Sequence, residues 1–153
     1  MKILVAAAGR HGGTWEIAEE IGRALVSELR GSAVVRVARA EDVTTVEEFD
    51  AVLRTMKVWL FSSGPVGTPP KPAEDPVDVT RLMTLSGARG HVVFPGRIDR
   101  SLLRFGERAV VTALRVEDGD YRDWPAVRAW AGEVAAALKP ARTREVSGHV
   151  ERG

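Results

Sequence analysis

The chain has 153 residues, of which 44% are hydrophobic and 28% are charged, and its formal net charge is +1. This length and composition suit one globular domain that buries a core, and a charge so close to zero excludes a general attraction to nucleic acid or anionic membranes. Because there is no cysteine, disulfides, thiolate nucleophiles and cysteine-bound metals are excluded as well.

The sequence contains no apolar signal region at its start and no stretch of transmembrane length. We therefore expect no integral membrane segment and a cytoplasmic location. The three histidines, His11, His91 and His149, are scattered along the chain, so we predict no metal site.

The first element is a short apolar run, Lys2 to Ala8, which suits a parallel strand that is covered on both faces. A glycine-rich turn follows from Gly9 to Thr14. From Trp15 onward, a first helix is predicted by apolar residues at helical spacing, namely Ile17, Ala18, Ile21, Leu25 and Leu29. The stretch Arg30 to Ser32 is expected to end it.

The turn between this strand and this helix is a candidate anion site. Its three glycines let the backbone turn tightly and direct several N–H groups toward one point, and the positive end of the helix dipole adds to them. The spacing of Gly9, Gly12 and Gly13 matches neither a P-loop nor the dinucleotide fingerprint. A mononucleotide phosphate fits better, and a plain tight connection is the alternative.

In the middle of the chain, Val34 to Val37 is expected to form a second strand. The spacing of Val46, Phe49, Leu53 and Met56 then predicts one crossover helix over 43–56, with Thr45 and Glu48 as a capping box. A right-handed crossover places the next strand, Val58 to Ser62, beside the first one. The loop that follows lies at the ligand-binding edge of such a sheet, so its candidate ligand contacts are Ser62, Ser63, Gly64 and Pro65. A plain connection is again the alternative.

The second half continues with helices and strands. We expect a short helix that starts at Asp75 or Pro76, ends at Ser86 and turns Val79, Leu82 and Met83 inward, and then a buried strand, His91 to Pro95. In the loop after this strand, Gly96 to Arg100, the charges are expected to be solvated. The apolar stretch from Leu102 to Leu114 predicts a buried helix.

The last helix is predicted from Pro125, near its first turn, to Leu138. Its apolar residues recur at helical spacing, namely Val127, Trp130, Ala131, Val134 and Leu138. Tyr121 and Trp124 lie at its entry, and a capped helix start explains them better than a ligand-stacking role does. Residues 139–153 are polar and are expected to form a flexible tail.

Several stretches resemble a known family. Lys2 to Val5 followed by His11 to Ala18 is similar to the start of flavodoxins, and more specifically to flavodoxin-domain proteins related to menaquinone-dependent protoporphyrinogen oxidase. Later stretches agree: Val58 to Pro65, His91 to Asp99, and Gly119 to Trp124. The resemblance implies an α/β fold over residues 1–138, a flavodoxin-like three-layer α/β/α domain with a reduced, mostly parallel sheet of about four strands.

The resemblance also implies a cofactor, FMN, and a role in electron transfer or in flavin-dependent oxidation of a small substrate, with a redox partner or a small molecule as the reaction partner. FMN would supply the chemistry, so no catalytic residue is predicted. The residues implied for the phosphate are Gly9, Arg10, His11, Gly12, Gly13 and Thr14; those for the flavin edge are Ser62, Ser63, Gly64 and Pro65.

Two departures from the family support an alternative. Gly9 stands where a hydroxyl residue is usual, and between Val52 and Val58 on the order of 30 residues are missing, about one αβ unit, including the loop that covers the flavin ring. The alternative is a degenerate flavodoxin-like module without flavin that acts by protein–protein interaction. A homodimer is the other way to complete the ring site.

Overall fold

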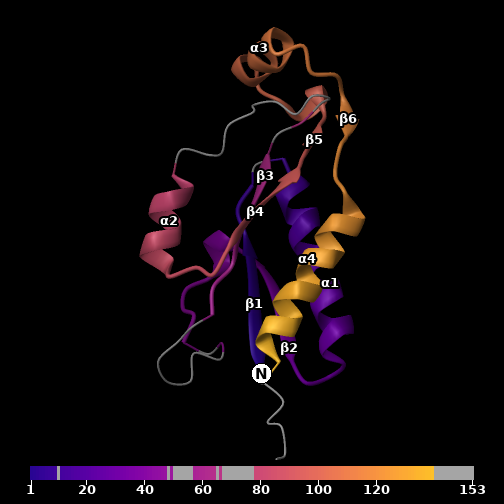
Figure 1. The fold of residues 1–153 in the computed structure, drawn as a ribbon. Coiled ribbons are helices and arrows are strands. Elements are labelled where there is room, and N and C mark those ends of the chain that lie inside the picture. Colours follow the sequence, from indigo (N-terminus) through magenta and orange to yellow (C-terminus); the bar gives the residue numbers. More distant parts are fainter. Residues whose placement is uncertain (10, 48, 50–56, 65, 67–77, 140–153) are drawn as a thin grey trace, which may run out of the picture.

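The computed structural model describes residues 1–9, 11–47, 49, 57–64, 66 and 78–139. Within these residues the protein is a mixed α/β structure with four helices and short strands (Figure 1). The strands are β1 (Lys2–Ala7), β2 (Val34–Arg39), β3 (Leu60–Gly64), β4 (His91–Pro95), β5 (Arg97–Ile98) and β6 (Gly119–Asp120). The α-helices are α1 (Gly13–Leu29), α2 (Val79–Ser86), α3 (Phe105–Ala113) and α4 (Trp124–Leu138).

The first part of the prediction is confirmed. β1 and β2 are parallel neighbours, paired from Lys2 with Val34 to Ala7 with Arg39, and α1 connects them. The helix ends with Arg30 at φ 42° and Gly31 at φ 80°. These left-handed conformations stop the helix, and glycine adopts them without strain.

The core lies where α1 and α4 pack on each other and on the strands. Ile17, Leu25 and Val127 are its largest fully buried side chains. Trp130 of α4 meets Phe94 of β4 edge to face, with ring centroids 5.8 Å apart. The helical spacing seen in the sequence therefore identified the buried faces of both helices.

The sheet differs from the prediction. β3 and β4 pair in parallel, from Leu60 with His91 to Gly64 with Pro95, but in the described residues β3 is not hydrogen-bonded to β1. The four longer strands thus form two parallel pairs, and a cavity lies between β1 and β3. The strand expected over Val58 to Ser62 is β3, and it faces β1 across this cavity instead of pairing with it. Side chains of α1 and α4 pack against both pairs.

The crossover helix predicted over 43–56 is wrong at its start. A 3₁₀ turn, Ala40–Asp42, follows β2, and residues 43–46 have no regular structure. The Thr45 hydroxyl accepts a hydrogen bond from the Glu47 amide at 3.2 Å, which is a local turn contact rather than a helix cap. Glu48 and residues 50–56 lie outside the described residues.

The two helices of the second half are more exposed than predicted. In α2, Val79 and Met83 are half-buried, but Leu82 is 52% exposed. The helix expected to be buried over Leu102 to Leu114 is α3, which buries no residue, and its Phe105 is 91% exposed. Figure 1 shows the reason, because α3 stands at one end of the molecule, away from α1 and α4.

The stretch before α4 forms a small antiparallel pair. Arg97 of β5 pairs with Asp120 of β6, where the sequence predicted a loop from Gly96 to Arg100. Asp123 caps α4 by accepting a hydrogen bond from the Ala126 amide at 2.9 Å, as a capped helix entry requires. None of the described helices combines the length and the apolar character needed to span a membrane. The predicted tail beyond Lys139 lies outside the described residues.

Candidate functional site

The glycine-rich turn leaves a row of backbone donors at the start of α1. Gly12 precedes the helix at φ 77°, and no side chain caps this end. Within the described residues, the amides of Gly13, Thr14 and Trp15 have no hydrogen-bond partner. Three free N–H groups at the positive end of a 17-residue helix form an anion-binding arrangement.

Two of the glycines serve this geometry in different ways. Gly12 has the left-handed conformation that a side chain strains. A Cβ on Gly9 would lie 3.2 Å from both the Cβ and the Oγ1 of Thr14, so the absence of a side chain leaves room for the Thr14 hydroxyl inside the turn. At Gly13 a Cβ would meet nothing within 4 Å. Arg10 lies outside the described residues.

His11 carries the contact between this turn and α3. Its Nε2 lies 3.3 Å from each carboxylate oxygen of Glu107, and Glu107 also accepts a hydrogen bond from the Arg104 amide at 2.8 Å. The Nε2 atom of His11 is therefore engaged with a carboxylate.

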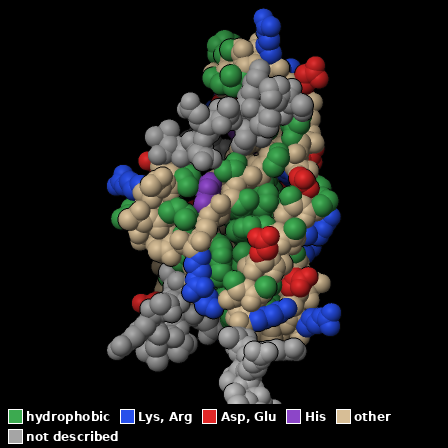
Figure 2. Space-filling model, in the orientation of Figure 1, with side chains coloured by type: hydrophobic (Ala, Val, Ile, Leu, Met, Phe, Trp, Pro, Cys, Tyr) green, Lys and Arg blue, Asp and Glu red, His purple; other side chains and the backbone are tan. Residues whose placement is uncertain are grey.

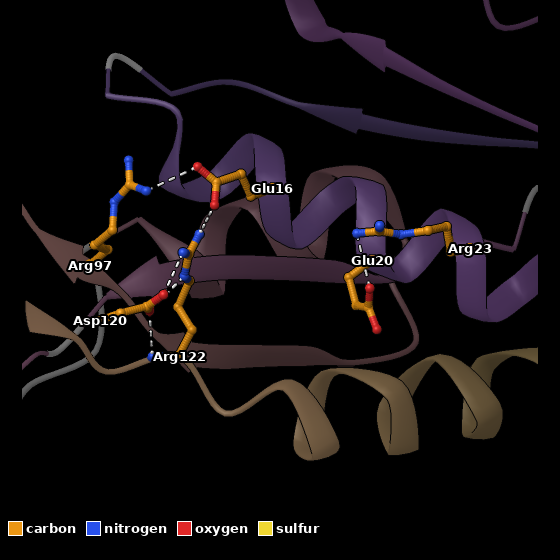
Figure 3. A network of polar contacts seen from close by, with 6 residues as sticks. All are labelled: Glu16, Glu20, Arg23, Arg97, Asp120 and Arg122. Carbon is orange, nitrogen blue, oxygen red and sulfur yellow. Dashed lines mark hydrogen bonds and ion pairs between the residues drawn. The ribbon is translucent and has the colours of Figure 1, made fainter.

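A charged network surrounds the first turn of α1, and sequence reasoning missed it (Figure 3). Arg122 donates from Nη1 to Glu16 at 2.6 Å, and from Nε and Nη2 to Asp120 at 2.7 and 2.6 Å. Arg97 adds a contact of 3.2 Å to the other oxygen of Glu16. The Arg122 side chain is only 4% exposed. Two arginines therefore balance the carboxylate that α1 places nearest to the anion site.

The same network changes proton affinities. The hydrogen bond from Arg122 lowers the pKa of Asp120, although partial burial opposes the shift. In return, the hydrogen bonds with Asp120 and then Glu16 raise the pKa of Arg122. Arg97 belongs to this network through its contact with Glu16, so it is not the freely solvated side chain that the sequence suggested.

The second predicted set of ligand contacts lies in a strand rather than a loop. Ser62, Ser63 and Gly64 belong to β3, and Pro65 lies outside the described residues. The Ser62 hydroxyl is 2.8 Å from Nε2 of His91 on the neighbouring strand. The Gly64 carbonyl accepts a hydrogen bond from the Gly96 amide at 3.1 Å. Ser62 is thus engaged inside the β3–β4 pair.

The elements that carry the two predicted sets are neighbours in the structure. α1 contacts β3, and Figure 1 shows β3 ending beside the start of α1. Gly64, the last residue of β3, is the member of the second set nearest to this end of the strand. The cavity between β1 and β3 is not lined by the glycine-rich turn. The donors are on the surface, with His11 through Thr14 half-exposed.

Comparison with protein-family models, with curated proteins and with solved structures finds no match for this chain. No group of three or more histidine or acidic side chains suited to a metal ion occurs in the part of the chain that the structure describes. The candidate site rests on its own geometry, which is a row of unpartnered backbone amides at the start of α1 and the two arginines that engage Glu16.

Proposed function

We propose that the turn Gly9 to Thr14 binds the phosphate of FMN and that the protein acts in electron transfer or in flavin-dependent oxidation of a small substrate. The observation that carries this proposal is the set of unpartnered amides at Gly13, Thr14 and Trp15. A phosphate satisfies these donors together and gains from the helix dipole. The residues present therefore fit this part of the cofactor.

In the proposed site each group has a separate task. The three amides hold the phosphate, and the Thr14 hydroxyl, which lies against Gly9, donates a further hydrogen bond. Arg97 and Arg122 keep Glu16 engaged and so reduce its repulsion of the anion. FMN supplies the redox chemistry. The chain's part is to hold it at the end of β1 and β3.

The arrangement of elements supports a flavodoxin-like three-layer architecture as part of the same proposal. The strand pairs β1–β2 and β3–β4 are each parallel, and α1 and α4 pack together on them. α2 lies on the other side of the strands from α1 and α4 in Figure 1. Ligands of open parallel sheets bind where the carboxyl ends of the strands meet, which is where the turn lies.

Titration with FMN tests the proposal. We expect the flavin fluorescence to be quenched and the visible absorption bands to shift as the protein is added. Gly12→Asp places a carboxylate beside the same amides and should weaken FMN binding at least tenfold, because it competes with the phosphate by charge and by hydrogen bonding. Gly31→Asp is the matched control, since Gly31 has a similar left-handed φ of 80° at the other end of α1. Absence of quenching, or equal losses in both variants, contradicts the proposal.

One observation favours the second candidate function, a flavodoxin-like module without flavin that acts by protein–protein interaction. α3 buries no residue, and its surroundings expose large apolar side chains: Leu102, Phe105, Val110 and Leu114. Exposed apolar groups clustered on one element are typical of an interaction site. Sedimentation of the flavin-free protein tests whether it forms a homodimer through this surface. If it does, Phe105→Ser should shift the equilibrium from dimer toward monomer.

A further inference from the structure

The gap between the two strand pairs is a cavity of about 390 Å³. It is lined by five consecutive residues, Lys2 to Ala6, and by Val58, Trp59 and Phe61 from the side of β3. α1 contributes Ile21 and Leu25, and α4 contributes Trp130, Val134 and Leu138. Protein cores pack with few voids larger than a water molecule, so a space of this size between two strands is a feature to be explained.

The lining of the cavity is apolar and aromatic, apart from two lysines, Lys2 and Lys57. Its volume lies in the range of small-molecule sites and equals that of roughly a dozen water molecules at about 30 Å³ each. Figure 2 shows hydrophobic side chains gathered on this face of the molecule, between β4 and α4. An apolar body therefore has both space and surface to bind.

Lys57 gives the cavity a charged end. Its ammonium group donates a hydrogen bond to the Ala137 carbonyl at 3.0 Å, near the end of α4, and the contact is exposed. Two of its three N–H donors remain for an anion. The proposed phosphate turn lies elsewhere, since no residue from Gly9 to Thr14 lines this cavity.

We propose that this cavity binds an amphiphilic carboxylate, a molecule with an apolar body of about ten carbon atoms whose acidic group pairs with Lys57. The body lies between β1 and β3 against Trp59, Phe61 and Trp130. The carboxylate stays at the edge of the cavity in contact with solvent. This site is separate from the FMN proposal and does not depend on it.

Fluorescence of cis-parinaric acid provides the first test, with decanoate as the competitor. We expect parinarate emission to rise on binding, with energy transfer from tryptophan, and decanoate to displace it. Decanol has the same chain without the charge and should compete roughly 2- to 5-fold more weakly, because an ion pair in contact with solvent contributes about 0.5 to 1 kcal/mol. No rise in emission, or equal competition by decanol and decanoate, overturns the proposal.

Two kinds of variant locate the site. Lys57→Glu should weaken decanoate about tenfold or more and leave decanol unchanged, whereas Arg81→Glu on the exposed surface of α2 should change neither. Val134→Phe fills the cavity from α4 and should remove both ligands. Val110→Phe, the same substitution at a 58% exposed position of α3, is its control.

Ile3→Phe fills the cavity from β1 and keeps the test decisive if Val134→Phe does not fold. Ligand binding that survives both substitutions in folded protein places the ligand elsewhere and overturns the proposal. Sedimentation at the same protein concentrations measures the oligomeric state and so tests whether a second copy of the chain occupies the cavity. A dimer that dissociates in the two filled variants would show that a second copy of the chain covers the cavity, which also overturns it.

Discussion

Replacing Arg122 with methionine tests whether the charged network holds the first turn of α1 in place. Methionine keeps much of the length of the side chain but removes three hydrogen bonds of 2.6 to 2.7 Å to Glu16 and Asp120. It also removes the guanidinium group, which lies 4.5 Å from the ring centroid of Trp124. The arginine is almost fully buried, so no water replaces these contacts on its side.

The expected cost follows from these contacts. Hydrogen bonds to charged groups contribute roughly 1.5 to 3 kcal/mol each, but the carboxylates of Glu16 and Asp120 are 38% and 43% exposed and regain water when the arginine is lost. We therefore expect the free energy of unfolding to fall by about 3 kcal/mol in total. For a chain of this length the melting temperature should fall by about 6 to 12 °C.

Arg128→Met is the matched control. Arg128 also joins α4 to α1, through a contact of 2.9 Å to Glu20, but its side chain is 52% exposed. Exposed pairs contribute at most about 1 kcal/mol. Thermal and urea unfolding followed by circular dichroism measures both variants. If Arg122→Met costs no more than Arg128→Met, the network is an ordinary surface feature and the reasoning is refuted.

Two further predictions concern packing and pH. Gly22→Ala should cost about 1 to 3 kcal/mol in unfolding free energy, because its Cβ would lie 2.5 Å from Val37, whereas Gly132→Ala, with nothing within 4 Å, should gain about 0.5 to 1 kcal/mol. Because Arg122 lowers the pKa of Asp120, this carboxylate stabilises the fold above its unfolded pKa of about 4 and loses that effect as the pH falls below it. Asp120→Asn should therefore lower stability at pH 7 and have little effect near pH 2; an equal loss at both pH values contradicts the assignment.

The sequence predicted best those helices in which regularly spaced apolar residues mark the buried face. In α1 and α4 the apolar positions repeat over four turns or more, so the buried face is set by the helix itself, and Ile17 and Val127 are fully buried as expected. The same argument failed for α3, where the spacing is also helical but Phe105 is exposed. Spacing identifies an apolar face but does not show that another element covers it.

The region after β2 shows a second limit. Val46 and Phe49 have the spacing of a helix face. In the structure, however, residues 43–46 have no regular structure, and both side chains line the cavity. Phe49 also lies 5.9 Å from the guanidinium of Arg36 on β2. Contacts with distant parts of the chain decide the conformation of so short a segment, and the spacing of its apolar residues does not predict such contacts.

The candidate site was predictable only in part. The glycine-rich turn follows from local residue types, and the left-handed φ of Gly12 agrees with the need for glycine there. The partnership of Arg122 with Glu16 spans 106 positions and leaves no local signal. Asp120, two residues before Arg122, was the one hint of a paired charge. Ser62 was misplaced because the strand runs further than its apolar residues.

The phosphate cradle is tested most directly by comparing FMN with riboflavin, which has the same ring and sugar chain but no phosphate. Fluorescence quenching titrations at low and high salt measure both dissociation constants. The amides of Gly13, Thr14 and Trp15 predict that FMN binds roughly 10- to 150-fold more tightly for each charge-assisted hydrogen bond that it gains, with the difference decreasing at high salt. Equal affinity for FMN and riboflavin would contradict the account.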